Sequence, residues 1–170
     1  LLETLDAILK HWDNLPAATE AIETYLTGIP EARCFSTRLF KKAIELQQLG
    51  QIEEAISFVK ICLKFDSENF EYLWYITTYL QESGQPIESI EYAQQCLQAG
   101  GDRAEKVAAM YLLLKGLMQS GGNWERACQV EADYRHFLCD LSQSQEPIKI
   151  KTLVKILTSG IYFSYFRDRP

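Results

Sequence analysis

The short motifs that mark catalytic, metal and nucleotide sites are missing from this sequence. The two histidines, His11 and His136, lie far apart in the chain, and none of the five cysteines belongs to a Cys-x-x-Cys pair of the kind found in zinc and redox sites. There is no Gly-Lys-Ser/Thr phosphate loop and no Gly-x-Ser-x-Gly nucleophile turn. We therefore expect no catalytic site, no bound metal and no cofactor in this chain.

Positive charge and long apolar runs are also scarce. The 17 basic residues are outnumbered by 23 acidic ones, and the net charge of −6 argues against a nucleic acid or an anionic membrane as partner. No apolar run approaches the roughly 18 residues of a membrane-spanning helix, and the first residues lack the pattern of a signal peptide. Because the chain begins Leu1-Leu2 and stops at Pro170, we expect it to be part of a longer protein.

What the sequence does contain is a repeated helical pattern. The stretches Leu49–Ile56 and Ser83–Ile90 are similar, and 34 residues separate Gly50 from Gly84. Further pairs with this spacing are Leu46 and Leu80, Gln51 and Gln85, Glu54 and Glu88, Ile56 and Ile90, Cys62 and Cys96, and Leu63 and Leu97. A third motif is aligned on Gly122, 38 residues after Gly84, which predicts an insertion of about four residues.

A sustained helical period of 34 residues resembles the tetratricopeptide (TPR) repeat, a helix–turn–helix unit. Each helix pair has an apolar face that it cannot bury alone, so neighbouring pairs stack on one another. The expected fold class is therefore all-α, a right-handed, TPR-like superhelix of about nine helices. Four antiparallel pairs are expected within residues 1–146, at about 1–30, 32–66, 69–101 and 103–141, and residues 147–170 should form a capping or connector helix.

The repeat alignment predicts the environment of particular residues. Gly50 and Gly84 should end their helices with a positive φ, a conformation that other residues adopt at a cost. Ala55 and Ser89 should lie where two helices approach closely. Leu49, at helical spacing from the preceding apolar residues, should face inward.

Two cysteines, Cys62 and Cys96, occupy the same repeat position, which usually holds a small residue in TPR proteins. We expect both to be small buried residues without redox or metal chemistry. Free thiols of this kind favour a reducing, cytoplasmic compartment.

In TPR proteins the first helix of each pair lines the concave face, so the resemblance implies a groove lined by the first helices of the pairs. Trp74 and Tyr75 directly follow Leu73, so the three side chains cannot all face the core, and at least one is expected to project into the groove. Phe40, Trp74 and Leu112 each lie ten residues before a motif glycine. The predicted groove residues are Thr37, Phe40, Ile44, Glu71, Trp74, Tyr75, Thr78, Leu112 and Leu113, with Lys41 and Ala109 beside them. Alternatively, the chain's own final helix covers these positions.

The C-terminal stretch Tyr162–Pro170 resembles the connector between the TPR array and the catalytic region in bacterial relatives of the SPINDLY-type O-linked N-acetylglucosamine transferases. The resemblance implies a parent glycosyltransferase that uses a sugar nucleotide, with this chain presenting protein substrates. The lysine, asparagine and arginine clamp with which some TPR domains hold a peptide carboxylate is absent, because the matching positions hold residues such as Phe40 and Tyr75.

The leading interpretation is a protein–protein interaction module that binds a helix or a peptide in an apolar concave groove. Two alternatives stay open: the substrate-presenting arm of a larger glycosyltransferase, and a structural domain that forms homo-oligomers. The chain itself is not expected to be an enzyme.

Overall fold

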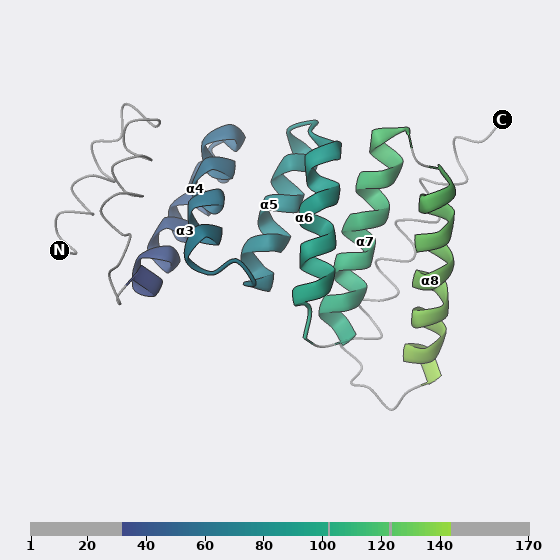
Figure 1. The fold of residues 1–170 in the computed structure, drawn as a ribbon. Helices are drawn as coiled ribbons and strands as arrows, with labels where there is room; N and C mark the ends of the chain where they lie inside the picture. Colours follow the sequence, from purple (N-terminus) through teal and green to yellow (C-terminus); the bar gives the residue numbers. More distant parts are fainter. Residues whose placement is uncertain (1–31, 102, 123, 144–170) are drawn as a thin grey trace. The chain divides into compact units, whose positions relative to one another are not determined.

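The computed structural model describes residues 32–101, 103–122 and 124–143, and all regular structure in these residues is α-helical. The helices are α3 (Ala32–Gln48), α4 (Ile52–Phe65), α5 (Phe70–Glu82), α6 (Pro86–Ala99), α7 (Arg103–Ser120) and α8 (Trp124–Gln143) (Figure 1). The all-α prediction is thereby confirmed for the described residues. None of these six helices has both the length and the apolar character that crossing a membrane requires. The helices predicted within 1–30 and 147–170 lie outside the described residues.

The chain divides into two compact units, the first ending at Gly84 and the second beginning at Gln85. In the first unit α4 packs against both α3 and α5. In the second unit α7 packs against both α6 and α8. Because the turns between these packed helices are only a few residues long, successive helices run antiparallel.

Local side-chain chemistry starts several of the helices. Asn69 caps α5, since its Oδ1 accepts the backbone N–H of Tyr72 at 3.2 Å. Pro86 is the first residue of α6, where its fixed φ suits the helix and its missing N–H has no intrahelical acceptor to lose. Near the start of α7 the carboxylate of Glu105 accepts the backbone N–H of Gly101 at 2.7 Å. The beginnings of α5, α6 and α7 are therefore favoured by residues that lie within a few positions of the first helical residue.

Three glycines with a positive φ follow the ends of α3, α5 and α7. Gly50 has a φ of 80° and Gly84 a φ of 77°, which confirms the prediction for both. In the third motif the left-handed residue is Gly121, with a φ of 66°, and not Gly122. For α7 the alignment on Gly122 is therefore wrong by one residue, whereas α8 begins two residues after Gly122, as α4 and α6 begin two residues after Gly50 and Gly84. Two adjacent glycines tolerate the conformation equally well, and α7 ends at Ser120, directly before the first of them.

This corrected register predicts different effects for two neighbouring substitutions. A Cβ atom on Gly121 would meet no heavy atom within 4 Å, so Gly121→Ala is strained only through its backbone and should cost about 1 kcal/mol of unfolding free energy. At Gly122, where φ is not positive, alanine would make an ordinary 3.8 Å contact with the Ser120 carbonyl oxygen and should cost nothing measurable. Urea denaturation of the two variants checks this, and an equal loss in both would contradict the new register.

The buried residues of α4 extend over more than one face of the helix, because α4 packs against both α3 and α5. In the first unit the buried apolar residues are Phe35, Leu39, Phe40, Ala43 and Leu46 on α3, Ala55, Ile56, Phe58, Val59, Ile61, Cys62 and Leu63 on α4, and Tyr72, Leu73, Ile76, Tyr79 and Leu80 on α5. In the second unit they include Ala93, Cys96, Val107, Ala109, Leu112, Leu113, Leu114, Leu117, Ala127 and Tyr134. Ala55 and Ser89 are both fully buried, as their predicted positions between closely packed helices require. Leu49 was expected to face inward but is 73% exposed, because it lies in the turn after α3.

Two of the cysteines are buried, as predicted. Cys62 and Cys96 are both inaccessible to solvent, and the Cys62 thiol donates a hydrogen bond to the Ser36 carbonyl oxygen at 3.3 Å. Burial raises the pKa of each thiol to about 12, with the charge of Glu105 adding to the effect at Cys96. Both residues are therefore neutral packing groups at physiological pH. On α8, by contrast, Cys128 is exposed.

Candidate interaction surface

Aromatic contacts join α3 and α5, the two helices that carry most of the predicted groove residues. The ring of Phe40 on α3 lies 4.8 Å from that of Tyr72 and 5.0 Å from that of Tyr75, measured between centroids. The Tyr72 hydroxyl also donates a hydrogen bond to the Ser36 hydroxyl at 3.1 Å, within the protein interior. The two helices therefore lie side by side, although they are not consecutive in the chain.

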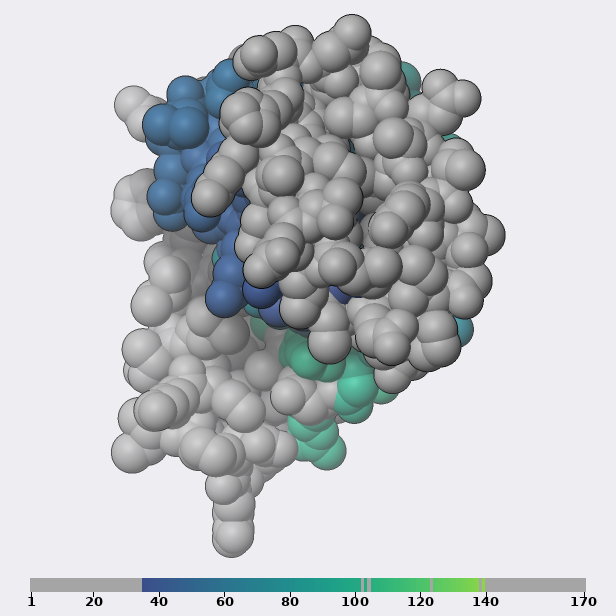
Figure 2. All heavy atoms as spheres, turned by 90° about the vertical axis from the view of Figure 1, so that its left-hand side faces the viewer, coloured from purple at the N-terminus to yellow at the C-terminus, as the bar shows by residue number. Residues whose placement is uncertain are grey.

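The accessible part of the predicted groove in the first unit is narrower than expected. Phe40 is only 6% exposed and belongs to the core. Six other predicted residues are exposed or half-buried: Thr37 and Ile44 on α3, and Glu71, Trp74, Tyr75 and Thr78 on α5. We call these six residues the α3–α5 surface. Atoms of α3 reach the molecular surface on the face drawn in Figure 2.

The two half-buried rings of α5 are held in place by their neighbours. Trp74 stacks on Phe70, with ring centroids 6.3 Å apart and an interplanar angle of 27°. Tyr75 makes edge-to-face contacts with Phe40 and, at 5.7 Å, with Tyr79. Both rings thus offer accessible apolar area without the freedom of loosely tethered side chains, which lowers the entropy lost when a ligand is bound.

The predicted row formed by Phe40, Trp74 and Leu112 is not supported. In the second unit, Leu112 is 2% exposed and Leu113 is 4% exposed, so neither offers a surface to a ligand. When the third motif is aligned on Gly121, the residue ten positions earlier is Tyr111, which is half-buried. The one-residue error in the alignment moved the predicted strip from the accessible side of α7 to its buried side, since successive helical residues differ by about 100°.

Two residues near the C-terminal end of α5 were not predicted as site residues. The hydroxyl of Tyr79 is buried and has no hydrogen-bond partner among the described residues. Burial raises the pKa of Tyr79 to about 12, and the nearby Tyr75 and Glu82 contribute in the same direction. The four-residue spacing of Tyr75 and Tyr79, followed by Glu82 on the same helix side, is the signal from which the sequence could have indicated them.

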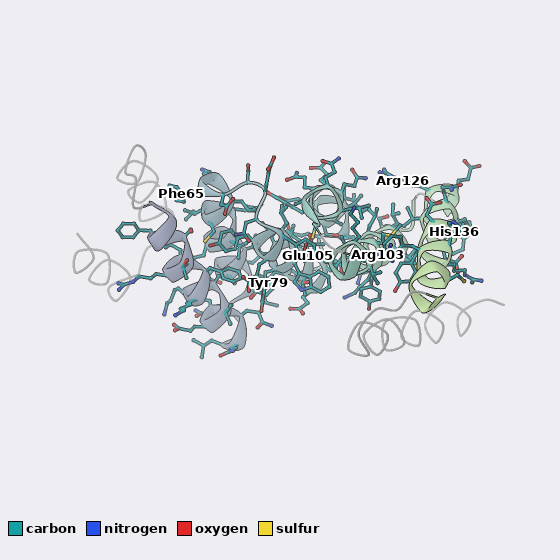
Figure 3. The ribbon with its side chains drawn as sticks, turned by 90° about the horizontal axis from the view of Figure 1, so that it is seen from below. Phe65, Tyr79, Arg103, Glu105, Arg126 and His136 are labelled. Carbon is teal, nitrogen blue, oxygen red and sulfur yellow. The ribbon has the colours of Figure 1, made fainter. Side chains whose placement is uncertain are left out.

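No metal centre accompanies this surface in the part of the chain that the structure describes. There, no group of three or more histidine, cysteine, aspartate or glutamate side chains is arranged to hold a metal ion. His136 is an exposed residue of α8 (Figure 3). His11 and the stretch Tyr162–Pro170, from which the link to glycosyltransferases was drawn, lie outside the described residues.

No protein-family model matches the chain, and no curated protein sequence matches it significantly. The TPR resemblance therefore rests on the residues themselves, namely the 34-residue spacing of Gly50 and Gly84 and the positions that share it.

Proposed function

We propose that this chain is a TPR-like stack of helix pairs that acts as a protein–protein interaction module and binds a peptide on its α3–α5 surface. The repeat period, the positive-φ glycines Gly50 and Gly84, and the fully buried small residues Ala55 and Ser89 support the stacking. Within the first unit, α4 packs against the helices before and after it, as successive helices do in such repeats.

The observation that carries the binding proposal is the state of Trp74 and Tyr75. Both rings stay half-buried and accessible while ring contacts with Phe70 and Phe40 fix their positions. Tryptophan and tyrosine are enriched among the residues that dominate binding energies, because each combines a large apolar area with a polar group. A helical or extended peptide laid across α3 and α5 would bury both rings.

Trp74→Ala tests this proposal. Peptides would first be selected from a random phage-displayed library with the whole chain as target, and then measured by fluorescence polarisation. We expect affinity to fall about 30-fold on truncation of Trp74, the effect of losing about 2 kcal/mol at an aromatic anchor. Because Trp74 is only half-buried, unfolding free energy should fall by less than the roughly 3–5 kcal/mol of a fully buried tryptophan.

Trp124→Ala is the matched control, since Trp124 is 54% exposed at the start of α8 and lies outside the α3–α5 surface. It should leave peptide affinity unchanged. Equal weakening by the two substitutions, or a failure to select any peptide, would contradict the proposed function.

A further inference from the structure

We propose that Ser36 and Tyr72 are positioning residues for the α3–α5 surface, although both are buried and neither touches a ligand. The hydrogen bond between their hydroxyls orients the Tyr72 ring, Phe40 packs on that ring, and Phe40 in turn holds the accessible ring of Tyr75. The inference rests on the proposed function and adds the residues that prepare its surface from within the core.

The hydrogen bond joins two helices that do not follow each other in the chain. The Tyr72 hydroxyl on α5 donates to the Ser36 hydroxyl oxygen on α3 at 3.1 Å, and the two residues are 6% and 3% exposed. Breaking this bond would leave the buried Tyr72 hydroxyl without a partner among the described residues, which is unfavourable. Because the hydroxyl is the far end of the tyrosine side chain, the bond fixes the direction in which the Tyr72 ring points.

Ser36 is also held by α4, the helix that lies between α3 and α5 in the chain. The thiol of Cys62, which is inaccessible to solvent, donates to the Ser36 backbone carbonyl oxygen at 3.3 Å. The residue to which Tyr72 is bonded is therefore tied to both of the helices that follow it. Buried polar groups that satisfy one another in this way make the packing of a core rigid and specific. We infer that these bonds define how α3 lies against α5.

Ring contacts lead from this bond to the surface. Phe40 follows Ser36 by one helical turn, so the two residues share a side of α3. The Phe40 ring centroid lies 4.8 Å from that of Tyr72 and 5.0 Å from that of Tyr75, the latter contact being edge to face. Unlike the other two rings, that of Tyr75 is only half-buried. A less ordered Tyr72 ring would therefore loosen the ring that a peptide contacts, and more entropy would be lost on binding.

The competing account is that close packing alone holds Tyr75. The ring of Tyr79 also contacts that of Tyr75, edge to face at 5.7 Å, and would restrain it without help from Tyr72. In that case the hydroxyl–hydroxyl bond stabilises the fold and has no effect at the surface. The two accounts predict similar losses of stability but different peptide affinities when the bond is removed.

Tyr72→Phe tests the proposal, because it removes the hydroxyl and keeps the ring. With the whole chain and the selected peptides, fluorescence polarisation should show an affinity about fivefold weaker, which corresponds to the net contribution of one hydrogen bond. In a Tyr75→Ala background the same substitution should have no further effect on affinity, since it acts through the Tyr75 ring. Thr77→Val is the matched control, because the buried Thr77 hydroxyl donates within α5, to the Leu73 carbonyl oxygen at 2.7 Å. It should lower stability and leave the affinity unchanged.

A double variant, Ser36→Ala with Tyr72→Phe, separates positioning from stability. It removes both hydroxyls of the pair, so its thermal midpoint should lie closer to that of the unmodified chain than the midpoint of Tyr72→Phe does. Its peptide affinity should nevertheless be about fivefold weaker, as in the single variant. NMR relaxation of the Tyr75 ring in the isotope-labelled, peptide-free chain gives a second readout: ring order should fall in both variants and stay unchanged in Thr77→Val.

The outcomes distinguish this inference from the proposed function. If peptides are selected and their affinity is unchanged in both Tyr72 variants, or equally weakened by Thr77→Val, the positioning role alone is refuted. If no peptide is selected but the Tyr75 ring becomes less ordered in both Tyr72 variants, the proposed function alone is refuted. If no peptide is selected and the ring order is unchanged, both are refuted.

Discussion

Phe40→Ala is expected to lower the unfolding free energy by about 3–5 kcal/mol, the loss typical of a buried phenylalanine. Phe40 is 6% exposed, and its ring contacts both Tyr72 and Tyr75. Truncation would therefore open a cavity between α3 and α5 in addition to removing buried apolar area. Urea denaturation measures this loss of unfolding free energy as a shift of the midpoint at constant slope.

Phe70→Ala provides the comparison, because Phe70 is half-buried and its ring stacks on Trp74. It should destabilise the protein by clearly less than Phe40→Ala. If Phe40→Ala lowers the unfolding free energy only slightly but greatly weakens peptide binding, Phe40 belongs to the binding surface, as the sequence indicated.

Leu112→Ala is expected to cost about 2–5 kcal/mol, because Leu112 is 2% exposed in the core of the second unit. Met110→Ala, at a half-buried position two residues earlier on α7, should cost less. The alignment on Gly122 predicts the opposite for Leu112, namely little change in stability and a loss of binding. The unfolding free energies of the two variants, with peptide affinity as the second measurement, therefore distinguish the two registers.

Much of the helical structure follows from local chemistry that the sequence states directly. Gly50 and Gly84 adopt the positive φ that ends a helix, and Asn69 caps α5 through its side chain. Ala55 and Ser89, two small residues separated by the same 34 positions as the two glycines, are both fully buried. The turns and the cap depend on a few neighbouring residues, so a single sequence is enough to predict them.

The candidate surface could be predicted only in part. Trp74 and Tyr75 were identified because consecutive helical residues cannot share one face with Leu73. Tyr79 and Glu82 were not identified, although their spacing from Tyr75 places them on the same side of the helix. That spacing does not reveal that the Tyr79 hydroxyl is buried without a partner among the described residues, because burial depends on the side chains that other elements pack around it.

By itself, therefore, the sequence determined the helical class of the described chain, the left-handed turns at Gly50 and Gly84, and the buried faces of helices such as α4. The tertiary structure alone decided that Gly121 takes the third turn, that Phe40 is covered by the rings of α5, and that Leu112 is buried. The physical reason is that periodicity reports which residues share a face of one helix, whereas burial depends on which other helix packs against that face.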